Sequence, residues 1–177
     1  MTSAGRFMGW GAVMDITYNL PAEGLDGLAV KETTMSAPAV QPEANGKLSI
    51  IMFSGTADKF IPLGVLAQAA AAMGMQVNIF VTGFALRGFT KEHQNLPFPA
   101  EFDDLVSGLQ RGMQAAHVAP WDSMLGQAKE LGAKVYACSM MAEVMGLKKQ
   151  DFKPMIDDVV GAATFLQESE KGQTIFI

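Results

Sequence analysis

The sequence predicts an α/β protein: a three-layer α/β/α sandwich around an open, mainly parallel five-stranded sheet. Short apolar runs recur along the chain, helix-like segments alternate with them, and glycine or proline separates the two kinds. This alternation is typical of strand–helix–strand units, whose consecutive strands run parallel. It begins at Lys47, so we expect an α/β domain over residues 47–177, preceded by an N-terminal arm or tail over residues 1–46.

The first strand–helix–strand unit is expected directly after the arm. Residues 48–53 form an apolar run typical of a central parallel strand that is buried on both faces. A helix over residues 63–73 follows, with Pro62 in its first turn, where a missing amide proton costs little. Residues 76–82 are the second strand, and the connection between the two strands should cross over right-handedly.

The remainder of the domain is expected to add three strands. Residues 83–119 are interrupted by glycine and proline and contain one helix, residues 101–116, whose apolar positions fit one face. A second amphipathic helix, residues 121–131, leads to a strand over residues 133–137. The last expected elements are a helix over 139–146, a strand over 156–160, a helix over 162–171 and a strand over 174–177.

The arm differs from the domain in its pattern. It contains several prolines and glycines and shows no sustained period of 3.6 or 2 residues. Its apolar residues are too numerous for a purely solvated linker. Two interpretations therefore stay open, a mobile leader or a segment that packs on the domain or on a neighbouring subunit.

Composition limits the classes of protein and of partner. The chain has 49% hydrophobic and 18% charged residues, enough for one sizeable core, and its net charge of −5 argues against nucleic-acid binding. One cysteine excludes an intrachain disulfide, and the first residues do not resemble a secretory signal, so we expect a cytoplasmic location. The longest apolar stretch, residues 65–75, is too short for a transmembrane segment.

The single cysteine, Cys138, is the main candidate for a reactive residue. It follows a predicted strand and precedes a predicted helix, and sites in open parallel sheets gather beyond the carboxyl ends of the strands. The positive end of a helix favours a thiolate, which would be a nucleophile. Free cysteine is also among the most buried residue types, so a structural role fits its position equally well.

Other residues could line a site around Cys138. The amide region of Ser139 could stabilise an anion, and Met140, Met141 and Met145 could form a soft pocket for sulfur or fill the core. Gly55, Thr56 and Asp58 follow the first strand and could add polar groups, although Asp58 could equally cap the next helix. Their loop matches neither of the glycine-rich nucleotide motifs.

Metal and cofactor sites are not predicted. The chain has one cysteine and two histidines, His93 and His117, which lie far apart in the irregular region. Neither histidine has an orienting partner nearby in the sequence, so a cysteine–histidine hydrolase also has little support.

Four segments together resemble the DsrE/DsrF/DsrH-like family, specifically its DsrE2 branch. The first is the cysteine segment from Gly132 to Leu147, GAKVYACSMMAEVMGL. The others are residues 48–58, with SGTAD at their end, residues 69–80, AAAAMGMQVNIF, and residues 161–177, GAATFLQESEKGQTIFI. The resemblance spans roughly residues 47–177 and implies a small α/β protein, usually oligomeric, of a sulfur relay or sulfur oxidation pathway.

The resemblance implies that Cys138 holds sulfane sulfur as a persulfide and passes it to an acceptor thiol, as a sulfur carrier or possible sulfurtransferase. The implied partners are sulfur donor and acceptor proteins or low-molecular-weight thiols. Peroxidase activity is not expected, because there is no resolving cysteine. The alternative is a non-catalytic, oligomeric ligand-binding or assembly module with a structural Cys138. In either case we expect a homo-oligomer, because the arm is apolar and the irregular segment 83–119 is rich in phenylalanine. The phenylalanines are Phe84, Phe89, Phe98 and Phe102.

Overall fold

A computed structural model describes residues 4–9, 12–17, 46–92 and 95–177. The chain divides into two compact units, Met1–Val40 and Gln41–Ile177. Each unit is described by itself.

The described part of the first unit is a β-hairpin. Strands β1 (Ala4–Gly9) and β2 (Ala12–Thr17) pair antiparallel, from Gly9 opposite Ala12 to Ala4 opposite Thr17. The sequence analysis predicted no strand here, because two glycines and adjacent apolar residues hide the alternation of period 2 in strands of only six residues. Residues 18–45 of the arm lie outside the described residues.

The second unit is built on a five-stranded sheet. Every pair of neighbouring strands is parallel, and the order across the sheet is β6-β5-β4-β3-β7. The strands are β3 (Lys47–Met52), β4 (Gln76–Val81), β5 (Lys134–Cys138), β6 (Asp158–Val160) and β7 (Gln173–Phe176).

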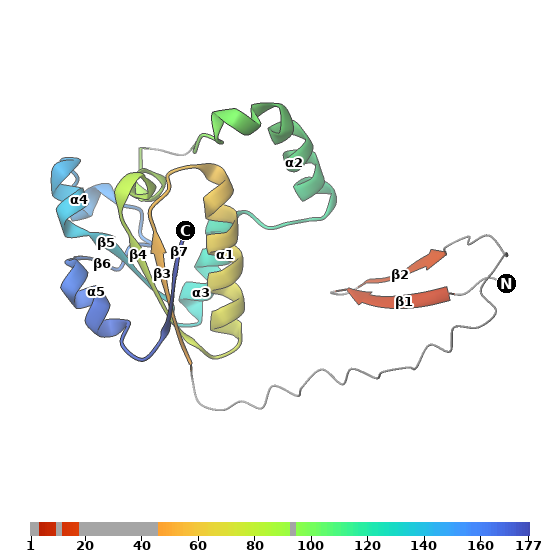
Figure 1. The fold of residues 1–177 in the computed structure, drawn as a ribbon, viewed down its shortest axis with the longest axis horizontal. Coiled ribbons are helices and arrows are strands. Elements are labelled where there is room, and N and C mark those ends of the chain that lie inside the picture. Colours follow the sequence, from red (N-terminus) through yellow and green to blue (C-terminus); the bar gives the residue numbers. More distant parts are fainter. Residues whose placement is uncertain (1–3, 10–11, 18–45, 93–94) are drawn as a thin grey trace, which may run out of the picture. The chain divides into compact units, whose positions relative to one another are not determined.

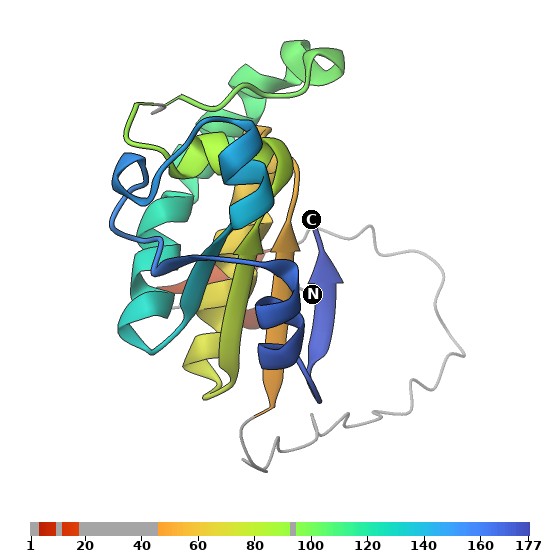
Figure 2. The same ribbon diagram turned by 90° about the vertical axis from the view of Figure 1, so that its left-hand side faces the viewer.

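Helices cover both faces of this sheet. Helices α1 (Ala57–Ala72) and α3 (Trp121–Glu130) lie on one face, and α4 (Ser139–Val144) and α5 (Ala162–Glu168) lie on the other (Figures 1 and 2). The predicted three-layer α/β/α sandwich with an open five-stranded sheet is confirmed, and its sheet is entirely parallel. Three short 3-10 helices complete the unit: η1 (Gly83–Phe89), η2 (Ala100–Phe102) and η3 (Lys149–Asp151).

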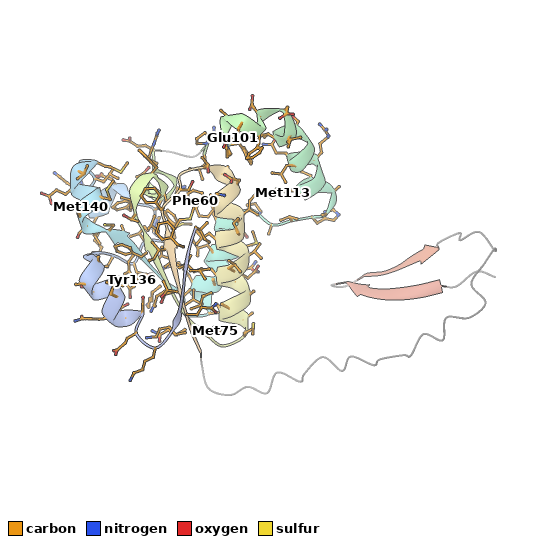
Figure 3. The ribbon with its side chains drawn as sticks, in the orientation of Figure 1. Phe60, Met75, Glu101, Met113, Tyr136 and Met140 are labelled. Atoms are coloured by element: carbon orange, nitrogen blue, oxygen red, sulfur yellow. The ribbon has the colours of Figure 1, made fainter. Side chains whose placement is uncertain are left out.

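The core has a large and a small part because side chains alternate between the faces of the strands. The large cluster includes fully buried residues of α1 and of the central strands, among them Phe60, Ile50, Ile79 and Val135. The small cluster consists of Phe80, Cys138 and Phe165, and it lies under α5. Phe60 belongs to the larger cluster, and Tyr136 packs against the smaller one; both residues are labelled in Figure 3.

Helix α1 begins earlier than the sequence predicted. Its first residue is Ala57, and Thr56 is the N-cap residue with extended backbone, φ −94° and ψ 144°. Pro62 therefore lies inside the helix, and the prediction that it lies in the first turn is wrong. Proline indicates a helix start only statistically; here the helix tolerates the loss of one backbone hydrogen bond, because its buried face packs on the core.

Helices α1 and α3 approach each other closely at Gly64. A Cβ atom at this position would lie 2.9 Å from the carbonyl oxygen of Trp121 and 3.1 Å from its Cα atom. Both atoms belong to the backbone, which cannot turn away as a flexible side chain can. A glycine at Gly64 therefore sets the distance between the two helices.

Helix α2 (Asp103–Ala115) has an apolar face, as the sequence predicted, but it has no buried residue. Figure 3 shows Met113 on this helix and Glu101 just before it, apart from the sheet. Phe102, Leu105 and Leu109 are exposed. The helix thus leaves an apolar strip on the surface of the unit.

The contact at Gly64 predicts opposite effects for two glycine-to-alanine substitutions. Gly126→Ala, in the open interior of α3, should raise the free energy of unfolding by about 0.5–1 kcal/mol through helix propensity. Gly64→Ala has the same propensity gain but forces α1 and α3 apart, so it should lower that energy by about 1–3 kcal/mol. Urea unfolding followed by circular dichroism measures both, and equal effects of the two substitutions would contradict this packing.

Candidate functional site

Cys138 lies where the sequence placed it, between a strand and a helix. It is the last residue of β5 and the N-cap residue of α4, with φ −66° and ψ 118°. It pairs in register with Val160 of β6, and its neighbour Ala137 pairs with Val81 of β4. The thiol therefore stands at the carboxyl edge of the sheet, where parallel α/β folds collect their functional groups.

The side chain of Cys138 is covered. The residue is only 5% exposed and packs with Phe80 and Phe165, whose rings stack with their centroids 4.8 Å apart. Tyr136 and Met141 pack against the same cluster. The thiol thus lies in an aromatic environment beneath α5.

Helix α5 is fastened to the sheet at its C-terminal end. The backbone carbonyl of Glu168 accepts hydrogen bonds from Lys47 Nζ at 2.5 Å and from Asn78 Nδ2 at 3.2 Å. The hydroxyl of Ser169 donates to the carbonyl of Phe165 at 2.8 Å. These bonds hold the short helix so that Phe165 stays over Cys138.

Tyr136 adds a side-chain link between β5 and α5. Burial raises the pKa of Tyr136 well above its ordinary value of 10.0, and a hydrogen bond with the Glu168 carboxylate and the negative charges of Glu168, Asp157 and Asp158 raise it further. The phenol is therefore neutral at physiological pH and can donate to Glu168. Tyr136 precedes Cys138 by two residues, so both side chains lie on the same face of β5.

Only some of the residues predicted to surround Cys138 lie close to its side chain. Ser139 is exposed and lines a pocket of about 440 Å³ together with Glu143, Lys148 and Lys149. Met140 is 60% exposed, Met141 packs on the cysteine cluster, and Met145 packs on the larger core cluster.

Gly55 and Thr56 belong to a different part of the carboxyl edge. They line a pocket after β3, next to Phe53 and Phe84, and Cys138 is not among its lining residues. Strand β4 separates β3 from β5, which places the ends of β3 and β5 about 10 Å apart. The structure does not bring Gly55 and Thr56 into one pocket with the thiol.

Asp58 lies in the first turn of α1, and the N-cap position that the sequence analysis considered for it belongs to Thr56. It lines an apolar groove together with Phe102 and Leu105. Partial burial raises the pKa of Asp58, but hydrogen bonding with Thr56 and the ammonium of Lys59 outweigh this, so the pKa lies below its ordinary value of 3.8. Lys59 Nζ lies 3.2 Å from Asp58 Oδ2.

Phe80 and Phe165 are the site residues that sequence reasoning missed. The sequence could have indicated Phe80, because β4 is the neighbour of β5 and alternate residues of a strand face the same side of the sheet. Phe165 had no such signal, because its place over Cys138 depends on how α5 returns across the sheet.

Within the described residues, no group of three or more His, Cys, Asp or Glu side chains could hold a metal ion. In the same part of the chain, no helix is both long enough and apolar enough to cross a membrane.

The fold and the cysteine define a small, parallel α/β/α domain with one thiol at the carboxyl edge of its sheet. A family model described as DsrE/DsrF/DrsH-like matches residues 44–103 and 103–177. The chain belongs to this family, which confirms the resemblance found in the sequence.

Individual relatives are distant. The chain is 26% identical over 156 residues to YrkE of Bacillus subtilis, an uncharacterized protein, with 73% of this chain and 95% of YrkE covered. It is also 26% identical over 147 residues to the sulfur carrier protein DsrE2 of Allochromatium vinosum, covering 68% of this chain and 91% of the relative. A solved structure of a protein of unknown function, MTH1491 of Methanobacterium thermoautotrophicum, is 14% identical, with a TM-score of 0.49, covering 75% of this chain and all of that one.

The environment of Tyr136 predicts a pH dependence. Because its pKa is raised in the folded protein, the stability that comes from the neutral phenol is present below pH 10.0 and is lost as the pH rises through the raised value. A Tyr18→Phe variant leaves Tyr136 as the one tyrosine of the chain. In this variant the phenolate absorbance of Tyr136 should appear near pH 10 in urea but only at clearly higher pH in the native protein. Identical titration curves in the two states would contradict the burial of Tyr136 and its hydrogen bond with Glu168.

Proposed function

We propose that this protein is a sulfur carrier that holds sulfane sulfur as a persulfide on Cys138 and passes it to an acceptor thiol. The family and the sulfur carrier relative support a role in a sulfur relay. The observation that carries the proposal is the position of the single cysteine, at the β5–α4 junction on the carboxyl edge of the sheet.

The proposed chemistry needs no oxidant and no metal. The Cys138 thiolate attacks the outer sulfur of a donor persulfide, R–S–SH; a new S–S bond forms, the donor S–S bond breaks, and the donor leaves as its thiolate. In the second step an acceptor thiolate attacks the outer sulfur of Cys138–S–SH, and the Cys138 thiolate is regenerated. Each step exchanges one S–S bond for another, so atoms and electrons balance.

Access to the sulfur is the main structural demand of this function. The pocket beside Ser139 opens next to Cys138 in the chain, and Lys148 and Lys149 line it. Lys149 is paired with Asp158 at 2.8 Å, whereas no ion pair among the described residues includes Lys148. Neither Cys138 nor Phe165 is among the lining residues of this pocket. We propose that the donor and acceptor, proteins or low-molecular-weight thiols, first contact this edge of the sheet and reach the sulfur after Phe165 is displaced.

A second candidate function is a non-catalytic ligand-binding or assembly module in which Cys138 is structural. The burial of the thiol between Phe80 and Phe165 favours it. In this case the cysteine behaves as a small apolar residue and the binding surfaces lie elsewhere.

We also propose that the protein works in the cytoplasm as a homo-oligomer. The single cysteine fits a reducing compartment. Exposed apolar side chains at α2 and on the edge strand β7 support self-association. They are Phe102, the N-cap residue of α2, Leu105 and Leu109 of α2, and Phe176 of β7. Phe89, one of the four phenylalanines from which the sequence predicted a homo-oligomer, is fully buried and takes no part in this surface.

Persulfide loading tests the sulfur carrier. After incubation with inorganic polysulfide, intact mass spectrometry should show the addition of one sulfur atom to the wild-type protein and none to Cys138→Ala. Met140→Leu, an exposed substitution beside the cysteine, is the matched control and should load like the wild type. Loading of Cys138→Ala at the wild-type level would exclude Cys138 as the carrier.

The rate of alkylation separates the two candidate functions. A carrier thiol should react with iodoacetamide and with polysulfide in the native protein, even if more slowly than in urea, because Phe165 must move. A structural thiol should react with either reagent only after denaturation.

Self-association through α2 is tested by substitution. Leu105→Glu places a charge on the exposed apolar face of α2, and Ser107→Glu places the same charge on its polar face. Neither residue is buried, so both variants should fold. Light scattering at micromolar concentration should show an oligomer for the wild type and for Ser107→Glu and a smaller species for Leu105→Glu. A monomeric wild type would overturn the proposal.

A further inference from the structure

A pocket of about 330 Å³ lies at the carboxyl edge of the sheet, away from the cysteine cluster. The segments after β3 and β4 form it together with residues 95–97. Its size falls in the lower part of the range for small-molecule sites. The sulfur-carrier proposal makes no use of this space.

The pocket lies beyond the carboxyl ends of two neighbouring parallel strands, β3 and β4. Strand β3 is flanked by β4 on one side and by β7 on the other. Ligands of open α/β sheets bind outside the carboxyl ends of the strands, and this pocket lies at that edge.

Close packing holds the walls of the pocket in place. A Cβ atom at Gly55 would lie 2.7 Å from the carbonyl oxygen of Phe84, and one at Gly83, where φ is +52°, would lie 2.6 Å from the ring of Phe53. The Phe53 ring in turn stacks on Phe176, with their centroids 6.0 Å apart. The pocket is therefore formed before any ligand arrives.

The lining combines apolar walls with one positive charge. Phe53, Phe84 and Leu96 supply apolar surface, and the hydroxyl oxygens of Ser54 and Thr56 lie 3.0 Å apart. Arg87 is the one charged residue among the lining residues, and none of the ion pairs formed by the described residues includes it. A guanidinium that has no ion-pair partner among the described residues and lies at an apolar pocket favours a carboxylate, which it can bind through two parallel hydrogen bonds.

We propose that this pocket binds a small organic carboxylate with an apolar body, its carboxylate on Arg87 and its body between Phe53, Phe84 and Leu96. The site is separate from Cys138. Binding is therefore independent of the proposed sulfur chemistry, and each can fail without the other.

Calorimetric titration with octanoate tests the pocket, with 1-octanol as the neutral probe of the same chain length. The full-length protein should bind octanoate saturably with a roughly millimolar or tighter dissociation constant. Arg87→Gln should weaken octanoate about tenfold, as expected for one charge-assisted contact, and should leave 1-octanol unchanged. Arg111→Gln, which removes an exposed arginine of α2, is the matched control and should bind like the wild type, as should Cys138→Ala.

Amide chemical shifts locate the bound probe. Octanoate should shift the amides of residues 53–56 and of Phe84. The proposal is overturned if the wild type does not saturate, if Arg87→Gln binds octanoate as tightly as Arg111→Gln does, or if the shifts fall on the apolar groove of α2 instead. Phe84→Ala removes an exposed ring without touching the core, and it should weaken both probes.

Discussion

The parallel hydrogen bonding of β3 to both β4 and β7 is the constraint on which the rest of the structure depends. It makes β3 an interior strand, buried on both faces, and turns the carboxyl ends of all five strands to one edge. The thiol of Cys138 and the pocket beside Gly55 lie at that edge, although 83 residues separate them in the chain. A slip of one residue in β3 would exchange the faces of that strand and displace the segment that carries Gly55, whereas Cys138 is held by the pairing of β5 with β4 and β6.

The helices that cover the two faces of the sheet differ in length. The difference explains why one face is rigid and the other covers Cys138 only thinly. Helices α1 and α3 have 16 and 10 residues and enclose the larger core, so that face supplies rigidity. Helices α4 and α5 have six and seven residues, and the cover of Cys138 depends on one ring, Phe165, and on the bonds that reach Glu168. Local opening of such a short helix, even one hydrogen-bonded to the sheet, requires less free energy than opening of the larger core. In the proposed function, this cover would shield a persulfide from solvent and leave a route for sulfur exchange.

Much of the fold could be predicted from sequence because the domain is locally consistent. The apolar run at residues 48–53, the alanine-rich helix after it and the glycine-ended helix before β5 each gave the correct element, and the position of Cys138 at a strand–helix junction followed from them. Pro62 misled because a common start signal lies inside a packed helix. The pairing of Cys138 with Phe165, and the separation of Gly55 and Thr56 from the thiol, depend on strand order and on the return of α5, which no local pattern records.

The central claim is that Cys138 carries and releases sulfur. The most direct measurement is peptide mass spectrometry of the polysulfide-treated, alkylated protein, before and after addition of an acceptor thiol. The account predicts one extra sulfur atom on the tryptic peptide of residues 135–148, and its disappearance from that peptide as the acceptor gains it. A peptide that never gains the sulfur in the native protein, or gains it only after the chain is unfolded, would contradict the account.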